Sequence, residues 1–244
     1  MIEEFKELPF SKDANGNSKY ASFTGNVECM LSKLIESNMK FGNYKDLVEG
    51  RFKDKNRNDR SLFIQYAFTC MGNPVFNRDD GEQVIIHDLE HPDLVFVKKL
   101  ILQQYFYVPL SINKDIYQRI KESEGTFTLD KNLVMDLRNN PYSHPIQREE
   151  IAENFCQRDV KLAKLNINLI KKYFNVKTTN RILGYYPGNF TGLGFVSVGF
   201  VGKSPTTGVI GGSQSFVEAY DDIRYDDDRL FGVNIEDISK TSRK

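Results

Sequence analysis

The chain of 244 residues lacks tryptophan, has few cysteines and histidines, and carries no net charge because 33 basic residues balance 33 acidic ones. Three isolated cysteines exclude a disulfide framework and paired CxxC zinc ligands. The longest apolar stretch, residues 94–110, is interrupted by lysines and glutamines, so the sequence predicts no membrane span and no membrane partner. The acidic N-terminus has no signal-peptide core, and we expect a reduced, cytoplasmic protein.

Motifs that carry chemistry are also scarce. Residues 199–204 end like a phosphate-binding loop, but Ser197 stands where the pattern requires its first glycine. His87 and His91 have a spacing that suits zinc on a helix, but Pro92 places them at a strand–helix junction. We therefore predict no metal site, and the catalytic residues, if any, stay unknown.

Apolar residues recur at helical spacing along much of the chain. This periodicity predicts helices over residues 26–41, 44–50, 59–70, 92–106, 133–137, 146–156 and 159–174. Two short runs, 73–76 and 82–87, flank a polar loop that ends in Asp-Gly, which predicts a β-hairpin. Residues 1–25 read as irregular, and the glycine-rich text after Arg181 predicts short strands.

Three short helices followed by a two-stranded wing are typical of a winged helix. The adjacent helices 146–156 and 159–174 suggest a second helix-turn-helix. The sequence thus predicts a mainly α protein with small β-wings (α+β), built from tandem winged-helix-like units with a glycine-rich β C-terminal part. The break at 140–145 predicts a boundary between an N-terminal domain, 1–140, and a second domain, 141–244.

The neutral total hides an uneven distribution of charge. Residues 158–181 hold seven basic side chains and one acidic one, and residues 51–60 hold five and two. Residues 218–237 hold eight acidic side chains and two basic ones. Zero net charge therefore does not exclude nucleic acid, and a truncation before Glu218 is predicted to be strongly basic and to bind DNA at least as well as the whole chain.

Each basic patch lies in or beside a predicted recognition helix, where lysine and arginine would neutralise DNA phosphates. Base reading needs polar side chains on the same helices, and Arg60, Gln65, Asn166 and Asn168 are of the right type. An equally simple interpretation is that the patches are solvated faces of amphipathic helices. The predicted DNA contacts are Lys53, Lys55, Arg57, Arg60, Lys161, Lys164, Asn168, Lys171 and Lys172.

Several segments resemble a known family. Asn58-Asp59-Arg60 with Tyr66 and Phe68, the hairpin, and the run from Pro92 to Tyr105 are similar to the recognition region of type IIS restriction and nicking endonucleases of the AlwI group. The run from Ile146 to Cys156 resembles the start of their second helix-turn-helix. The resemblance implies DNA recognition by tandem winged helices. In that family a separate C-terminal domain carries the nuclease, whose PD-(D/E)xK pattern this sequence does not show.

We therefore predict sequence-specific binding of double-stranded DNA, as the recognition module or subunit of a restriction-type endonuclease system. Binding would need no cofactor, and the partners would be DNA and a nuclease domain or subunit. One alternative is a Mg²⁺-dependent type II restriction endonuclease active in this chain, with Asp221, Asp222 and Asp226 as ligands. Another is a phage or accessory protein that binds a second protein through the glycine-rich strands.

Overall fold

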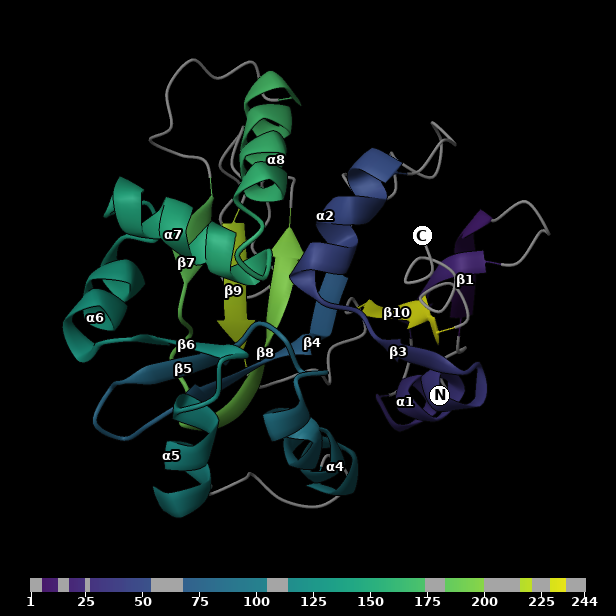
Figure 1. Ribbon diagram of the computed structural model, residues 1–244, viewed down its shortest axis with the longest axis horizontal. Helices are drawn as coiled ribbons and strands as arrows, with labels where there is room; N and C mark the ends of the chain where they lie inside the picture. The colour runs from purple at the N-terminus through teal and green to yellow at the C-terminus, as the bar shows by residue number, and fades with distance from the viewer. Residues whose placement is uncertain are drawn as a thin grey trace, which may run out of the picture.

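The computed structural model shows a mixed β-sheet with helices packed on both faces (Figure 1). The structure describes residues 6–12, 18–24, 27–53, 68–104, 114–173, 183–199, 216–220 and 229–235. The described strands are β1 (Lys6–Lys12), β2 (Ser18–Thr24), β3 (Met39–Phe41), β4 (Phe68–Asn77), β5 (Gln83–Ile86), β6 (Thr126–Leu129), β7 (Gly184–Tyr186), β8 (Gly192–Gly199), β9 (Phe216–Tyr220) and β10 (Leu230–Asn234). The described helices are α1 (Val27–Glu36), α2 (Tyr44–Lys53), the 3₁₀ turn η1 (Pro92–Leu94), α4 (Val95–Gln104), α5 (Lys114–Lys121), α6 (Lys131–Asn139), α7 (Pro145–Phe155) and α8 (Val160–Tyr173).

The ten described strands form one sheet in the order β1-β2-β10-β4-β8-β9-β7, with β3 beside β10 and with β5 and β6 extending from β4. Most neighbours are antiparallel, but β10 runs parallel to β4 and β7 runs parallel to β9. The last described strand, β10, thus lies between β2 and β4, which both come from the first half of the chain. Strands from both sides of residue 140, the predicted domain boundary, therefore share one sheet.

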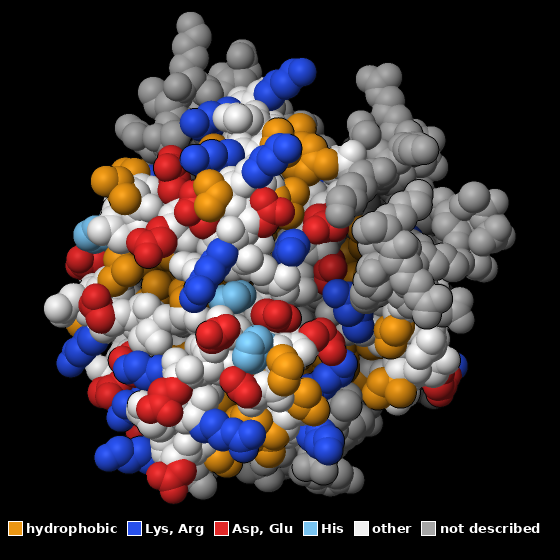
Figure 2. All heavy atoms as spheres, viewed as in Figure 1, with side chains coloured by type: hydrophobic (Ala, Val, Ile, Leu, Met, Phe, Trp, Pro, Cys, Tyr) orange, Lys and Arg blue, Asp and Glu red, His pale blue; other side chains and the backbone are white. Residues whose placement is uncertain are grey.

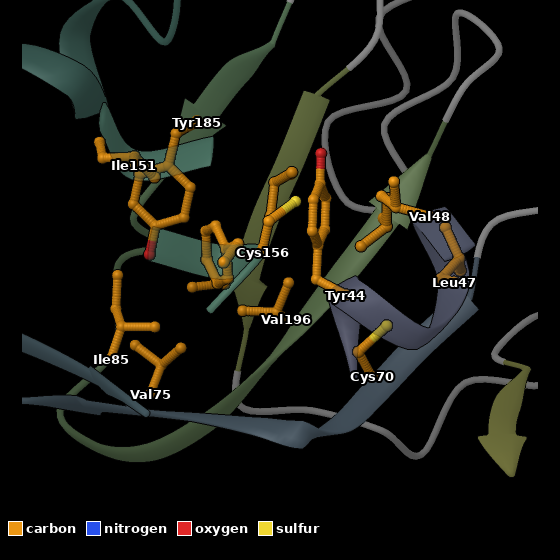
Figure 3. Close-up of a cluster of buried hydrophobic side chains, with 14 of the residues drawn as sticks. Tyr44, Leu47, Val48, Cys70, Val75, Ile85, Ile151, Cys156, Tyr185 and Val196 are labelled. Carbon is orange, nitrogen blue, oxygen red and sulfur yellow. The ribbon is translucent and has the colours of Figure 1, made fainter. Parts of the chain in front are cut away.

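Side chains of successive strand residues point to opposite faces, and each face is buried. On β4, Cys70 and Val75 belong to the core under α2, α6, α7 and α8, whereas Met71 and Phe76 belong to the core under α1, α4 and α5. Figure 3 shows Tyr44 of α2 inside the first of these cores. All ten residues of β4 are buried, because helices cover both of its faces.

The prediction of a mainly α, tandem winged-helix fold is wrong. Ten strands of one sheet dominate the described structure, and the predicted wing is the hairpin of β4 and β5 in that sheet. Residues 68–70, predicted as the end of a third helix, begin β4. Residues 6–12 and 18–24, predicted as irregular, pair as the antiparallel strands β1 and β2.

Several local predictions are confirmed. The helix predicted from Asn26 is α1, although it ends at Glu36 and residues 39–41 form β3. The helix predicted at 44–50 is α2, and those at 146–156 and 159–174 are α7 and α8. The hairpin turns where Asp-Gly was predicted, with Gly81 at φ +90°. The described segments of the glycine-rich C-terminal part form the strands β8, β9 and β10, as predicted for this part of the chain.

The C-terminal strands bear on a chain truncated before Glu218, whose DNA binding stays a prediction. Such a truncation removes β10 and most of β9, together with Leu230, Phe231 and Val233, which are buried. The acidic segment at 218–237 therefore overlaps the sheet, because β10 and part of β9 lie within it.

Candidate nucleic-acid interface

Helix α8 carries the strongest concentration of positive charge in the described structure, and its sequence explains how it forms. The Asp159 side chain accepts a hydrogen bond from the Leu162 amide at 2.9 Å, which caps the N-terminus. Leu162, Ala163, Ile167 and Ile170 recur at helical spacing and are buried, and Leu162 and Ala163 belong to the core between the sheet and α2. One face of the helix is thereby fixed, and the other face meets solvent.

The solvent face of α8 carries lysines along its length. Lys161, Lys164 and Lys172 are exposed, Lys171 is half-buried, and Asn168 is exposed among them. Figure 2 shows Lys and Arg side chains gathered over the part of the molecule where Figure 1 places α8. We call Lys161, Lys164, Lys171 and Lys172 the lysine row. From Lys161 to Lys172 it extends about 16 Å along the helix at 1.5 Å per residue.

No acidic residue lies within α8 itself. Among the described residues, no ion pair within 4 Å involves a lysine of the row. Lys171 and Lys172 lie in the last turn, where the negative end of the helix dipole stabilises a cation. The row is therefore a set of like charges that the described carboxylates do not neutralise by direct contact.

A buried hydrogen-bond network sets the orientation of α8 against α2. The Asn166 amide nitrogen donates to the Tyr44 hydroxyl at 2.9 Å, and the Arg51 guanidinium donates to the Asn166 carbonyl oxygen at 2.9 Å. Burial lowers the pKa of Arg51 to about 9, which still leaves the group charged at neutral pH. Burial also raises the pKa of Tyr44, so its hydroxyl stays neutral. Asn166, which we counted as a base-reading candidate, is 1% exposed and serves the interior.

The two predicted basic patches differ in how much of each the structure describes and in where their side chains lie. Arg51, counted in the first patch, is 3% exposed and belongs to the network under α8. Lys53 ends α2, and its side chain lies outside the described part of the chain, as do Lys55, Arg57, Arg60 and Gln65. The predicted contacts of the second patch, Lys161, Lys164, Asn168, Lys171 and Lys172, all lie on α8, and the structure brings them to one side of it.

The possible metal ligands weighed in the sequence, the His87–His91 pair and the C-terminal aspartates, form no metal cluster among the described residues. Over the described residues, no group of three or more His, Cys, Asp or Glu side chains is arranged to hold a metal ion. Asp221, Asp222 and Asp226, the ligands of the nuclease alternative, lie outside the described residues, and so do residues 200–204 of the loop-like motif. No helix among the described residues is both long and apolar enough to cross a membrane.

Sequence reasoning found the row but missed a second cluster at the turn between α7 and α8. There Gln157 donates to the His87 carbonyl at 3.2 Å and accepts from Lys45 at 3.2 Å. Gln157 and Arg158 both have positive φ, 54° and 61°, a conformation that non-glycine residues rarely adopt. Only long-range packing brings these residues together, so no local pattern could have indicated the cluster.

No protein-family model matches the sequence, and no curated protein matches it significantly. A solved structure from Nanoarchaeota, described in the words "Accommodation of massive sequence variation in Nanoarchaeota by the C-type lectin fold", aligns with 90% of this chain and 100% of its own. The two share 12% sequence identity, with a TM-score of 0.42. At this level of likeness neither a fold family nor a function is transferred to the chain.

Proposed function

We propose that the chain binds double-stranded DNA and that the lysine row of α8 is its contact surface. The observation that carries the proposal is the position of four lysines on the solvent side of a helix that contains no acidic residue. Cations arranged in this way release counterions from the DNA backbone when they neutralise phosphates, which is the main source of sequence-independent affinity.

The dimensions of α8 fit a duplex. A row of about 16 Å equals roughly five base-pair steps of about 3.4 Å, and the major groove is about 12 Å wide and admits an α-helix. Asn168 lies between Lys164 and Lys171 on the exposed side, where its amide can form two hydrogen bonds with an adenine edge. The lysines would thus position the helix and Asn168 would supply base preference.

The proposal concerns binding and not cleavage. Membership in a restriction-type endonuclease system, with a nuclease domain or subunit as partner, stays a prediction from the sequence, and so does a Mg²⁺-dependent nuclease within the chain. The proposed mechanism uses one helix, α8, in place of the two recognition helices expected from winged-helix units.

The proposal is tested by fluorescence anisotropy with a labelled random duplex of 24 base pairs at 50 mM salt. The wild-type chain is compared with the row variant, in which all four lysines of the row are changed to Gln. The control variant changes Lys33, Lys99, Lys114 and Lys131 to Gln, all exposed on other helices, and so loses the same net charge.

The wild-type and control proteins should bind, and the row variant should bind at least tenfold more weakly. Equal loss in both variants, or no wild-type binding at 50 mM salt, would contradict the proposal. A parallel incubation of plasmid DNA with Mg²⁺ distinguishes binding alone from cleavage.

A further inference from the structure

His87 is a buried histidine that directly follows β5. The residue is 5% exposed, and among the described residues neither ring nitrogen makes a hydrogen bond of normal geometry, although the Glu124 carbonyl lies close enough to favour the charged ring. Its backbone is fixed, because its amide donates to the Gly125 carbonyl at 2.9 Å, and its ring packs against Phe127 with centroids 6.1 Å apart. Burial without such partners disfavours the imidazolium more than the neutral ring, because the charged form carries two N–H donors and a positive charge.

The turn between α7 and α8 is hydrogen-bonded to His87. Gln157 donates from its amide nitrogen to the His87 carbonyl and accepts from Lys45 of α2 through its amide oxygen, both at 3.2 Å. Gln157 and Arg158 adopt two successive left-handed conformations, which L-amino acids disfavour, and their backbone amides close the turn by donating to the carbonyls of Asn154 and Glu153. The turn leads directly into the Asp159 cap and the first turn of α8.

The charges that face the imidazole favour its neutral form. Burial lowers the pKa of His87 below the ordinary value of 6.5, and the Arg158 and His91 side chains lower it further. Asp88 and the carbonyl of Glu124 act in the opposite direction without reversing the shift. A proton added to the ring therefore places a positive charge in a buried site, where Arg158 also disfavours it.

We propose that His87 and the Gln157–Arg158 turn form an acid-sensitive latch that holds the start of α8. When His87 takes up a proton, its repulsion from Arg158 releases the Gln157 contacts with His87 and Lys45, and the two left-handed residues relax. The first turn of α8, which carries Lys161, then loses its fixed position. The latch is independent of the proposed DNA binding, because its opening is observable in the free protein.

Hydrogen–deuterium exchange of the full chain tests the latch at pH 7.5 and pH 5.0, with rates corrected for the intrinsic effect of pH. Protection of the amides at 156–163 should fall at least tenfold at pH 5.0, while that of Val134 and Leu137 in α6 should not change. His87→Phe keeps an aromatic ring against Phe127 and should abolish the fall. His91→Gln should retain it.

No fall in the wild-type chain, or an equal fall in His87→Phe, would overturn the proposal. Arg158→Gln, at an exposed position, provides a second test should His87→Phe fail to fold. Removing that cation should move the midpoint of the pH transition upward, toward the value of an ordinary histidine. An unchanged midpoint would also overturn the latch.

Discussion

Asn166 and Tyr44 lie 122 positions apart in the sequence and meet in the interior through a hydrogen bond of 2.9 Å from the Asn166 amide to the Tyr44 hydroxyl. The carbonyl oxygen of the same side chain accepts from Arg51, so both ends of the amide are used. The Tyr44 amide in turn donates to Asn73 on β4. The exposed face of α8 is therefore oriented by contacts that reach through α2 to the sheet.

Asn166→Ala is expected to destabilise the fold, because it leaves a buried guanidinium and a buried hydroxyl without one of their partners. The loss should be about 2–4 kcal/mol in the free energy of unfolding, measured by urea denaturation. Asn168→Ala, two residues further along the same helix and exposed, is the matched control and should change stability by less than about 0.5 kcal/mol. Equal effects at the two positions would mean that the network does not hold α8.

Asn168→Ala should instead change the choice of DNA sequence. If Asn168 contacts a base, the variant loses about 1–3 kcal/mol of discrimination at one base-pair position of a site selected from a random duplex pool. Lys164→Gln should weaken binding to all sequences by a similar factor. A preference that is the same in Asn168→Ala and wild type would show that Asn168 does not read a base.

A chain ending at residue 217 should fail to fold cooperatively. Burying Leu230, Phe231 and Val233 contributes about 1.5–3 kcal/mol each, a total comparable with the 5–15 kcal/mol that stabilises a typical domain. Thermal unfolding followed by circular dichroism should show no sharp transition. A cooperative transition near that of the full chain would contradict the position of β10 in the sheet.

The acidic segment itself is better tested by substitution than by truncation. Changing Asp221, Asp222 and Asp226 to Asn removes three negative charges and leaves the buried residues of β9 and β10 in place. If the segment offsets the lysine row, DNA affinity at 50 mM salt should rise, with a smaller effect at 200 mM because salt screens the charges. An affinity that does not change would separate the segment from DNA binding.

Stability should fall as the pH drops below about 6.5. The pKa of His87 is lowered in the folded chain by burial first and by Arg158 next, so the unfolded chain takes up the proton at a higher pH. The contribution of neutral His87 to the free energy of unfolding is complete above the pKa that this histidine has in the unfolded chain. It is lost as the pH falls below that value, by at most about 1.4 kcal/mol per pH unit for one group. Urea denaturation at pH 7.5, 6.0 and 5.0 should show a smaller fall for His87→Phe.

Sequence patterns predicted the amphipathic helices well and the sheet poorly. Helix α8 shows a clear 3.6-residue period because one of its faces meets water. Strand β4 shows no alternation because helices bury both of its faces, and a run without period cannot be assigned from the sequence. The pairing of β10 with β2 and β4 joins distant segments, and no local signal indicates it.

The candidate site was predicted in part. Helical spacing brings the lysines of α8 together, and the structure confirms that they share the solvent side. The same spacing could have excluded Asn166, which lies four residues from both Leu162 and Ile170 on the buried face. Arg51 likewise follows Leu47 by four residues. Their polar side chains suggested surface positions. Their places in the helical repeats of α8 and α2 put both side chains on the buried faces of these helices.

The salt dependence of DNA binding tests the central claim most directly. With four phosphates neutralised, the logarithm of the binding constant should fall with the logarithm of salt concentration with a slope of about −3.6. This slope corresponds to a loss of affinity on the order of 100-fold between 50 and 200 mM salt. The row variant should lose most of this slope, and the control variant, with the same net charge, should keep it. A row variant that retains the wild-type slope would contradict the assignment of α8 as the DNA-binding surface.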